Sequence, residues 1–378
     1  MTTKRIRIVG ILVLILVWAS LVLFAWLKPE KESSDAERRK LALFPELNTE
    51  TLFDGSFMED FESYTLDQFP LRDTFRQLKA LFHYNVLMQK DNNGIYVVDG
   101  SAAKMEYPLN TQGLDKAVTR FNAIYETYLK DTGSTVFTAV IPDKGYYLAE
   151  ENGYPAMDYE KLFNTVRSQM PWSTYIDLTD TLDAQDYYRT DTHWKQENLL
   201  PVAQKICNNL GVTAPDGGKY KALALTRPFY GVYYGQAALP MDADTLTVLE
   251  ADHLNQCTTY TMQWDAKANA AYPQKLYDGV YDWAKEEAKD LYEVYLSGPQ
   301  SVMVIENPNA TTDRELIVFR DSFGSSLTPL LLEGYAKVTL VDIRYVPSNM
   351  LSYFVDFHGQ DVLFLYSTLI LNAGSALK

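Results

Sequence analysis

The sequence predicts an α/β fold built on a doubly wound, mainly parallel sheet, because apolar strands and amphipathic helices alternate from residue 114 to the C-terminus. Residues 134–142, STVFTAVIP, form a near-continuous apolar and β-branched run. Runs of this kind are typical of strands that are buried on both faces of a parallel sheet. Similar runs recur at 315–320, 337–343 and 361–367. Strands that alternate with helices in this way favour parallel βαβ units.

The helices of this pattern follow from the spacing of their apolar residues. Leu199, Val202, Ala203, Ile206 and Leu210 form a stripe at helical spacing, and the glycine that follows predicts the end of that helix. The remaining elements of the alternation are helices at 114–129 and 159–170 and a strand at 173–179.

The N-terminus predicts a membrane anchor. Lys4, Arg5 and Arg7 precede an uncharged run at 8–27 that is about long enough to span the hydrocarbon core. A secretory signal peptide is the alternative, but its apolar stretch is shorter and ends in small residues, whereas this run ends in FAWL. We therefore predict that residues 1–27 form a cytoplasmic tip and a single-pass signal anchor in the cell membrane, with the main domain extracellular.

A charged, turn-prone segment at 28–40 predicts a linker, and residues 41–378 are expected to form one extracytoplasmic domain. Two short helical stretches are expected between residues 41 and 87, and residues 93–100 resemble a hairpin strand bounded by glycines. Around 212–301 the alternation gives way to Tyr-, Gly- and Pro-rich sequence. We predict an irregular insertion on the sheet there, with one charged helix at 277–296.

Composition excludes some classes of partner. The chain has 378 residues and a net charge of −15, which argues against nucleic acid or an anionic membrane surface as the main partner. A neutral or solvated polymer fits better. Phosphate-binding and dinucleotide-binding glycine motifs are missing from the sequence, as are zinc-binding cysteine pairs, so no cofactor or metal is expected. Cys207 and Cys257 either form a disulfide or remain buried thiols.

Two loops of the predicted sheet carry polar residues suited to catalysis. Ligands of an open α/β sheet bind at the carboxyl ends of its strands. One loop holds Asp191, His193 and Trp194 just before the helix that begins near residue 199, and the other holds Asp321 and Ser322 between a buried strand and a helix. Serine needs a base within hydrogen-bonding reach, and that base needs a third group to orient it.

We predict that Ser322 is the nucleophile, His193 its base and Asp191 the group that orients the base, with the backbone N–H of Phe323 as an oxyanion donor. Residues two apart face the same way only in extended chain, so Asp191 and His193 must precede the helix. The alternatives are that Asp191 and Ser322 merely cap helices, that His193 packs against an aromatic neighbour, or that Asp191 and His193 bind a metal.

Three further residues at carboxyl ends of strands are candidates for lining the substrate pocket or assisting the oxyanion. They are Arg344, Tyr366 and Lys144. The alternatives are an ion-pair role for Arg344 and simple packing for Tyr366.

Several segments in order along the chain carry a resemblance to a known family. The main ones are GSFMEDFESYTLDQFPLRD at 55–73, YYRTDTHW at 187–194, PFYGVYYGQA at 228–237 and VFRDSFGSSLTPLL at 318–331. They resemble the DHHW family of bacterial extracytoplasmic proteins, which is similar to the alginate O-acetyltransferases of the SGNH hydrolase superfamily. The resemblance implies a three-layer SGNH hydrolase-like sandwich and a permuted triad of Asp191, His193 and Ser322. The chain has Thr192 where the family name implies a histidine.

The resemblance also implies a function. We expect O-acetylation of a cell-surface or exported polysaccharide, in which Ser322 takes the acetyl group and a sugar hydroxyl removes it. Because acetyl-CoA is cytoplasmic and the site is expected outside, a membrane-bound O-acyltransferase is the expected acetyl supplier. A carbohydrate acetylesterase and a non-catalytic glycan-binding surface protein are the alternatives, and the sequence does not separate them.

Overall fold

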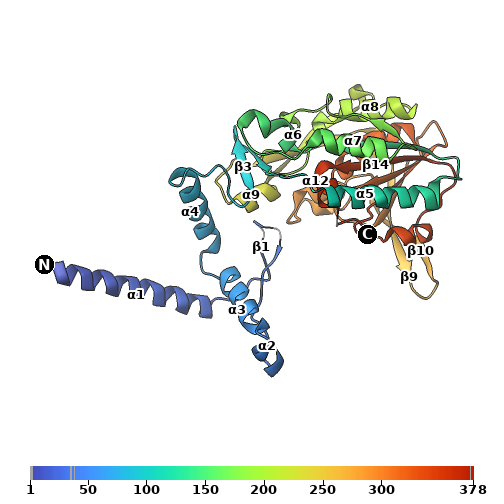
Figure 1. Ribbon diagram of the computed structural model, residues 1–378. Coiled ribbons are helices and arrows are strands. Elements are labelled where there is room, and N and C mark those ends of the chain that lie inside the picture. The colour runs from blue at the N-terminus through green and yellow to red at the C-terminus, as the bar shows by residue number, and fades with distance from the viewer. Residues whose placement is uncertain (1–2, 35, 38, 375) are drawn as a thin grey trace. The chain divides into compact units, whose positions relative to one another are not determined.

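The computed structural model describes residues 3–34, 36–37, 39–374 and 376–378 (Figure 1). The chain divides into two units. The first comprises Met1–Asn93 with Tyr234–Pro240, and the second comprises Gly94–Tyr233 with Met241–Lys378.

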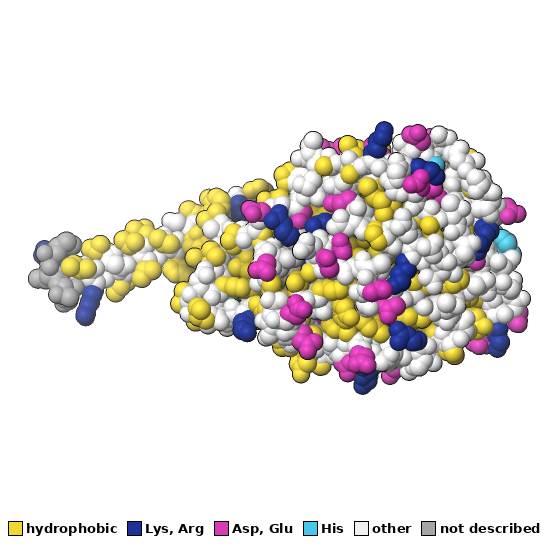
Figure 2. Space-filling view, turned by 90° about the horizontal axis from the view of Figure 1, so that it is seen from above, with side chains coloured by type: hydrophobic (Ala, Val, Ile, Leu, Met, Phe, Trp, Pro, Cys, Tyr) yellow, Lys and Arg dark blue, Asp and Glu magenta, His cyan; other side chains and the backbone are white. Residues whose placement is uncertain are grey.

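The first unit is helical and begins with one apolar helix, α1, at Thr3–Leu27. Its segment Arg5–Leu27 has a mean hydropathy of 3.0 and is not buried, so it is long and apolar enough to cross a membrane. Figure 2 shows hydrophobic side chains along most of the described part of this helix. A membrane anchor and a signal sequence share these properties.

Three helices, not the expected two, follow in the first unit. Gly55 adopts a φ of 85°, a left-handed conformation that glycine enters without steric cost, and so separates the first two of them. The secondary structure of this part comprises β1 Ser33–Ser34, β2 Arg39–Lys40, α2 Thr49–Phe53, α3 Ser56–Asp67 and α4 Arg72–Asn85.

The second unit is built on one sheet of eight strands in the order β10-β9-β11-β13-β12-β14-β5-β6. The five strands from β13 to β6 are parallel, whereas β10, β9 and β11 are joined to one another and to β13 by antiparallel pairing. The α/β prediction is therefore confirmed, with a mixed sheet. The strands are β5 Thr135–Ile141, β6 Thr174–Ile176, β9 Thr258–Asp265, β10 Ala270–Asp278, β11 Val302–Glu306, β12 Glu315–Arg320, β13 Lys337–Val341 and β14 Asp361–Ser367.

Each central strand divides its side chains between two apolar clusters, one on each face of the sheet. In β5, for example, Val136 and Val140 belong to one cluster and Phe137, Ala139 and Ile141 to the other. Helices α5 (Thr111–Ile124), α7 (Tyr159–Gln169) and α12 (Thr368–Ala373) contribute to the first cluster, and α8 (Leu200–Leu210) to the second. Figure 1 shows α5 and α8 on opposite sides of β14.

Short elements complete the second unit. The predicted hairpin is present as the antiparallel pair β3 (Ile95–Val98) and β4 (Ser101–Lys104). The short helices are η1 Tyr125–Leu129, α6 Lys144–Leu148, η2 Glu150–Asn152, η3 Ala184–Asp186, η4 Gln196–Asn198, η5 Gly217–Lys219, α10 Asp252–Asn255, α11 Gly324–Leu327, η8 Thr328–Gly334 and η9 Ser348–Tyr353. Helix α9 (Val232–Ala237) begins in the second unit and ends in the first, to which Tyr234–Pro240 belong.

The region 212–301 contains more regular structure than its composition indicates. Strands β7 (Lys221–Phe229) and β8 (Asp244–Glu250) pair with each other, while β9 and β10 extend the main sheet. The helix predicted at 277–296 is wrong. The chain there forms two short 3₁₀ turns, η6 (Trp283–Lys285) and η7 (Leu291–Val294). Burial explains the difference, because five of the six residues from Leu291 to Leu296 are buried, more than one face of a surface helix can bury.

Both cysteines are free thiols buried in the second unit. Cys207 lies in α8, and Cys257 donates from Sγ to the carbonyl of His253 at 3.2 Å. Of the two alternatives left by the sequence, a disulfide or two buried thiols, the structure has the buried thiols.

Candidate active site

The loop after β12 presents Ser322 at the carboxyl end of the sheet. Asp321 fixes this loop, because its carboxylate accepts hydrogen bonds from Phe323 N at 3.0 Å and from Ser367 N, at the end of the neighbouring strand β14, at 2.8 Å. Gly324 allows the tight turn, since a Cβ atom there would lie 2.8 Å from Cβ of Arg320. Ser322 itself remains partly exposed, so a substrate can reach its hydroxyl.

A second loop, at 187–194, carries the other two predicted residues. It closes on itself through an isolated bridge between Tyr187 and Trp194 and a hydrogen bond from Tyr188 N to His193 O at 3.0 Å. The buried Trp194 indole donates to Phe323 O at 3.1 Å and to Ser326 Oγ at 2.9 Å. The loop is thereby fastened directly to the turn that carries the serine.

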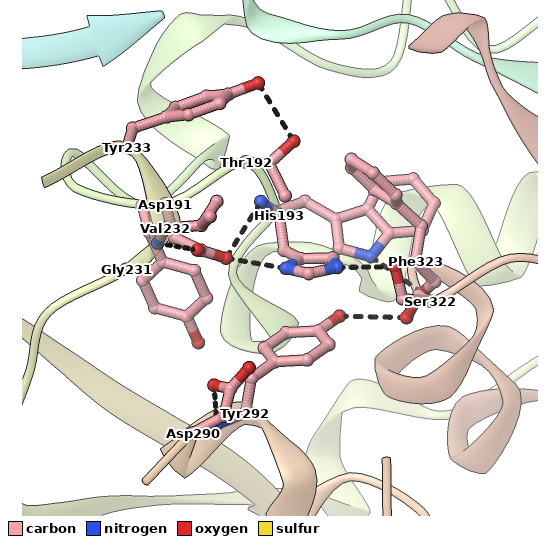
Figure 3. Close-up of polar contacts among 12 residues, drawn as sticks. Asp191, Thr192, His193, Gly231, Val232, Tyr233, Asp290, Tyr292, Ser322 and Phe323 are labelled. Atoms are coloured by element: carbon pink, nitrogen blue, oxygen red, sulfur yellow. Dashed lines mark hydrogen bonds and ion pairs between the residues drawn. The ribbon is translucent and has the colours of Figure 1, made fainter. Parts of the chain in front are cut away.

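The structure brings Ser322, His193 and Asp191 into one hydrogen-bonded row (Figure 3). His193 Nε2 lies 2.8 Å from Ser322 Oγ, and His193 Nδ1 lies 2.6 Å from Asp191 Oδ2. Asp191 is fully buried and its other oxygen accepts from Val232 N at 2.7 Å. This geometry allows His193 to take a proton from Ser322 while Asp191 fixes the tautomer of the ring.

The carboxylate of Asp191 depends on a glycine that comes from another loop. A Cβ atom on Gly231 would lie 2.1 Å from Cβ of Asp191, so only glycine fits where the two chains cross. Gly231 N also donates to Thr190 Oγ1 at 2.9 Å. Nothing in the sequence alone indicates this close approach.

Tyr292, which the sequence pattern does not single out, packs against the imidazole. The rings of Tyr292 and His193 are stacked, with centroids 3.9 Å apart and an interplanar angle of 12° (Figure 3). Tyr292 belongs to η7, in the segment for which a charged helix is predicted. No local pattern connects it to residue 193, so the sequence carried no signal for this contact.

The predicted oxyanion donor has another partner in the structure. Phe323 N donates to Asp321 Oδ1, so the oxyanion role of this N–H requires that bond to open. The helix that follows, α11, has only 4 residues before the chain continues as the 3₁₀ helix η8.

Arg344 lies at the carboxyl end of the sheet in an ion pair. Its Nε and Nη2 atoms donate to the Asp342 carboxylate at 2.9 Å and 2.6 Å, and this pairing is the principal influence that raises its pKa against the effect of burial. Tyr366 is 1% exposed and stacks on Phe121 at 4.9 Å. Within the described residues its hydroxyl has no hydrogen-bond partner.

Lys144 holds the loop that leads to Asp191. Its Nζ atom is buried and donates to the carbonyls of Tyr188 at 2.7 Å and Arg189 at 3.3 Å. Burial lowers the pKa of this amine from 10.5 to about 7, although the carboxylate of Asp191 opposes the shift. The geometry supports a part in loop structure for Lys144.

The structure places no further metal ligand among the described residues beside Asp191 and His193, the two residues of the alternative metal site. In the described parts of the chain, no group of three or more His, Cys, Asp or Glu side chains is placed to hold a metal ion. Asp191 and His193 are bound to each other and to neighbouring protein groups instead.

Comparisons with known proteins agree with this fold. The chain resembles a DHHW family protein from Eubacterium siraeum at 23% identity and a TM-score of 0.59, over 76% of this chain and 94% of that one. It resembles Bacillus cereus PatB1 with a sulfonyl adduct at 20% identity and a TM-score of 0.57, over 73% of this chain and 95% of that one. A weaker likeness, at 14% identity and a TM-score of 0.44 over 74% of this chain and 92% of the other, is to the O-acetyltransferase domain of Pseudomonas putida AlgJ. No curated protein sequence matches the chain.

A family comparison covers the part of the chain that holds the site. Residues 171–341 match the family described as DHHW protein, and this range contains Asp191, His193 and Ser322. The resemblance that the sequence segments indicate is therefore confirmed: the chain carries a DHHW domain match across its candidate active site.

Proposed function

We propose that this protein is an extracytoplasmic acyltransferase that moves an acetyl group through Ser322 onto a hydroxyl of a cell-surface or exported polysaccharide. The observation that carries the proposal is the row Ser322, His193 and Asp191, joined at 2.8 Å and 2.6 Å. A partly exposed serine backed by a buried histidine and a buried carboxylate is the arrangement that nucleophilic acyl transfer needs.

In the first step Ser322 Oγ attacks the carbonyl carbon of the acyl donor, and His193 Nε2 takes the hydroxyl proton. The charged imidazolium is stabilised by Asp191 on its other nitrogen. The tetrahedral intermediate then expels the donor's leaving oxygen, which receives the proton from His193. An acetyl ester on Ser322 remains.

In the second step a sugar hydroxyl attacks the acetyl carbonyl while His193 accepts its proton. Collapse of the second intermediate transfers the acetyl group to the sugar oxygen, and Ser322 recovers its proton from His193. Water in place of the sugar would give the esterase reaction. The two activities differ only in which hydroxyl reaches the acyl-enzyme.

Phe323 N remains our candidate donor to the oxyanion, because it directly follows the nucleophile, provided its bond to Asp321 opens on substrate binding. We assign Arg344 and Tyr366 to the wall of the pocket and Lys144 to support of the Asp191 loop. The carbonyl contacts of Lys144 favour its part in supporting the loop, and the ion pair with Asp342 fixes the position of the Arg344 guanidinium.

The strand order supports a permuted SGNH hydrolase-like sandwich. The parallel strands run β13-β12-β14-β5-β6, which becomes the doubly wound order 2-1-3-4-5 when numbering starts at β12. In that numbering Ser322 follows the first strand and the Asp191 loop follows the last. Permutation therefore accounts for a chain in which Asp and His precede Ser.

We further propose that α1 anchors the protein in the cell membrane with its short N-terminus in the cytoplasm. The apolar segment Arg5–Leu27 and the basic residues before it support this orientation. The catalytic domain then lies outside, where acetyl-CoA is lacking. A membrane-bound O-acyltransferase is the proposed source of acetyl groups.

The test uses the full-length chain in detergent with a chromogenic acetyl ester, with and without an oligosaccharide acceptor. Transferase activity predicts acetylated oligosaccharide, which Ser322→Ala abolishes and the buried neighbour control Ser325→Ala retains. Acetate release without acetylated sugar would identify an esterase. Sugar binding that survives Ser322→Ala, with no ester cleavage by the wild type, would contradict catalysis and favour a glycan-binding protein.

A further inference from the structure

We infer that Tyr292 is a positioning residue that holds the imidazole of His193 in line with Ser322 and stabilises its charged form during acyl transfer. The inference rests on the proposed function, but it concerns a residue outside the Ser-His-Asp row. Its starting observation is the parallel stack of the two rings, at 3.9 Å and 12°.

Tyr292 acts on the base and does not reach the substrate. Its side chain is 4% exposed, whereas Ser322 is partly open to solvent. The face of its ring contacts the face of the imidazole, and the edge of the imidazole points to Ser322 and Asp191 (Figure 3). Its hydroxyl also donates to the backbone carbonyl of Ser322 at 3.4 Å, so the variants below separate that contact from the effect of the ring on His193.

Tyr292 is itself held by three contacts, one of them the bond from its hydroxyl to Ser322 O at 3.4 Å. Its backbone N donates to Asp290 Oδ1 at 3.0 Å, and its hydroxyl lies 2.8 Å from Ser326 Oγ. Ser326 Oγ in turn accepts from the Trp194 indole at 2.9 Å. Through this chain of contacts Tyr292 ties η7 to the helix behind the nucleophile and to the residue after the base.

The stack restricts the movement that the hydrogen bonds leave free. The two bonds of His193 to Asp191 and Ser322 lie close to the plane of its ring, so they resist displacement within that plane. Tyr292 covers one face, and Phe323 approaches the ring at 4.9 Å and an angle of 52°. Tilting of the imidazole out of the plane is therefore opposed by aromatic contacts.

The same stack favours the protonated base. When Ser322 loses its proton, His193 becomes an imidazolium, and the negative face of an aromatic ring attracts a cation. A desolvated cation–π contact of about 2 kcal/mol corresponds to about a 30-fold change in rate. The ring of Tyr292, and not its hydroxyl, supplies this effect.

Steady-state kinetics with the chromogenic ester separates the ring from the hydroxyl. Tyr292→Leu is expected to lower kcat by about 10- to 30-fold with little change in KM, since the contact strengthens only as charge develops. Tyr292→Phe is expected to stay within about threefold of the wild type. Tyr335→Leu removes another buried tyrosine, beside Asp361 at the opposite end of the strands, and is expected to retain kcat.

A double-mutant cycle tests whether the effect passes through His193. In a His193→Ala background, Tyr292→Leu should cause no further loss. The inference would be overturned if Tyr292→Leu left kcat unchanged or if Tyr292→Phe lowered kcat as much as Tyr292→Leu. It would also be overturned if Tyr292→Leu lowered kcat by the same factor in the His193→Ala background as in the wild type.

Proton NMR of the imidazole gives a readout that does not need activity. A stacked tyrosine shields the His193 Hε1 proton, so its signal should move downfield in Tyr292→Leu and stay in place in Tyr292→Phe, with His193→Ala providing the assignment. If the wild type transfers no acyl group but these shifts are found, the proposed function fails and the positioning contact stands. Identical spectra for the wild type and both variants would overturn the contact itself.

Discussion

His193 Nε2 lies 2.8 Å from Ser322 Oγ, although 129 residues separate the two in the chain. The contact does not depend on that hydrogen bond alone. Trp194, directly after the histidine, donates to Phe323 O, directly after the serine. The two loops are thus joined one residue beyond each reacting group, and the distance between base and nucleophile is set by buried structure.

Gly231→Ala should disable the site from a position that touches no substrate. The new Cβ would lie 2.1 Å from Cβ of Asp191, so the aspartate must move and its bond from Val232 N must lengthen. A displacement of about 1 Å predicts a fall in kcat of about 100-fold. The matched control is Gly217→Ala, where the nearest atom would lie at 3.6 Å, and it should retain kcat. Equal activity of the two variants would contradict the proposed role of Asp191.

Asp191→Asn should show how much the negative charge of this side chain contributes to kcat, because the variant keeps the shape of the side chain. The amide fills the same space but cannot hold the Nδ1–H tautomer or balance an imidazolium, so we expect kcat to fall by roughly 10³- to 10⁴-fold. Asp177→Asn, at an exposed position, serves as the control. Activity of Asp191→Asn within a few fold of the wild type would show that the carboxylate is not needed.

Lys144 should make stability rise with pH. Burial lowers its pKa from 10.5 to about 7 in the folded chain, so between these values the unfolded chain binds more protons than the folded one. The free energy of unfolding of the wild type should therefore increase with pH over this window, relative to that of Lys144→Met. Urea titrations at several pH values measure the difference, with the exposed Lys116→Met as control. Parallel pH curves for the wild type and Lys144→Met would rule out the shifted amine.

Both cysteines should be inert thiols in the folded chain. Burial raises the pKa of Cys207 and of Cys257 to about 12, which leaves little thiolate at neutral pH. Iodoacetamide is expected to modify neither residue in the native protein and both in urea without reductant. Recovery of a disulfide-linked peptide would refute the free-thiol structure.

The parallel half of the sheet was predictable because each of its strands carries its own signal. β5, β12 and β14 are mostly apolar between their ends because both of their faces are buried. The end of α8 is marked by a glycine, Gly211, at a φ of 65°. The positions of Asp191, His193 and Ser322 followed from the general rule that loops at the carboxyl ends of parallel strands meet.

The contributions from 212–301 were not predictable in the same way. β10 is largely exposed, so it lacks an apolar run, and β9 is recognisable through its pairing with β10 and β11. Tyr292 and Gly231 act through contacts with residues far away in the chain, and such contacts leave no periodic pattern in the sequence. The chain has 27 tyrosines, so composition does not distinguish the one that stacks on His193 from the others.

The most direct test of the account is the mass of a trapped acyl-enzyme. The full-length protein is mixed with an activated acetyl ester, quenched in acid within one turnover, digested and analysed by mass spectrometry. We predict one added acetyl group on the peptide that contains Ser322, and its loss in Ser322→Ala and in protein pretreated with a sulfonyl fluoride. An acetyl group on another residue that persists in Ser322→Ala, or ester cleavage with no modified serine, would contradict the central claim.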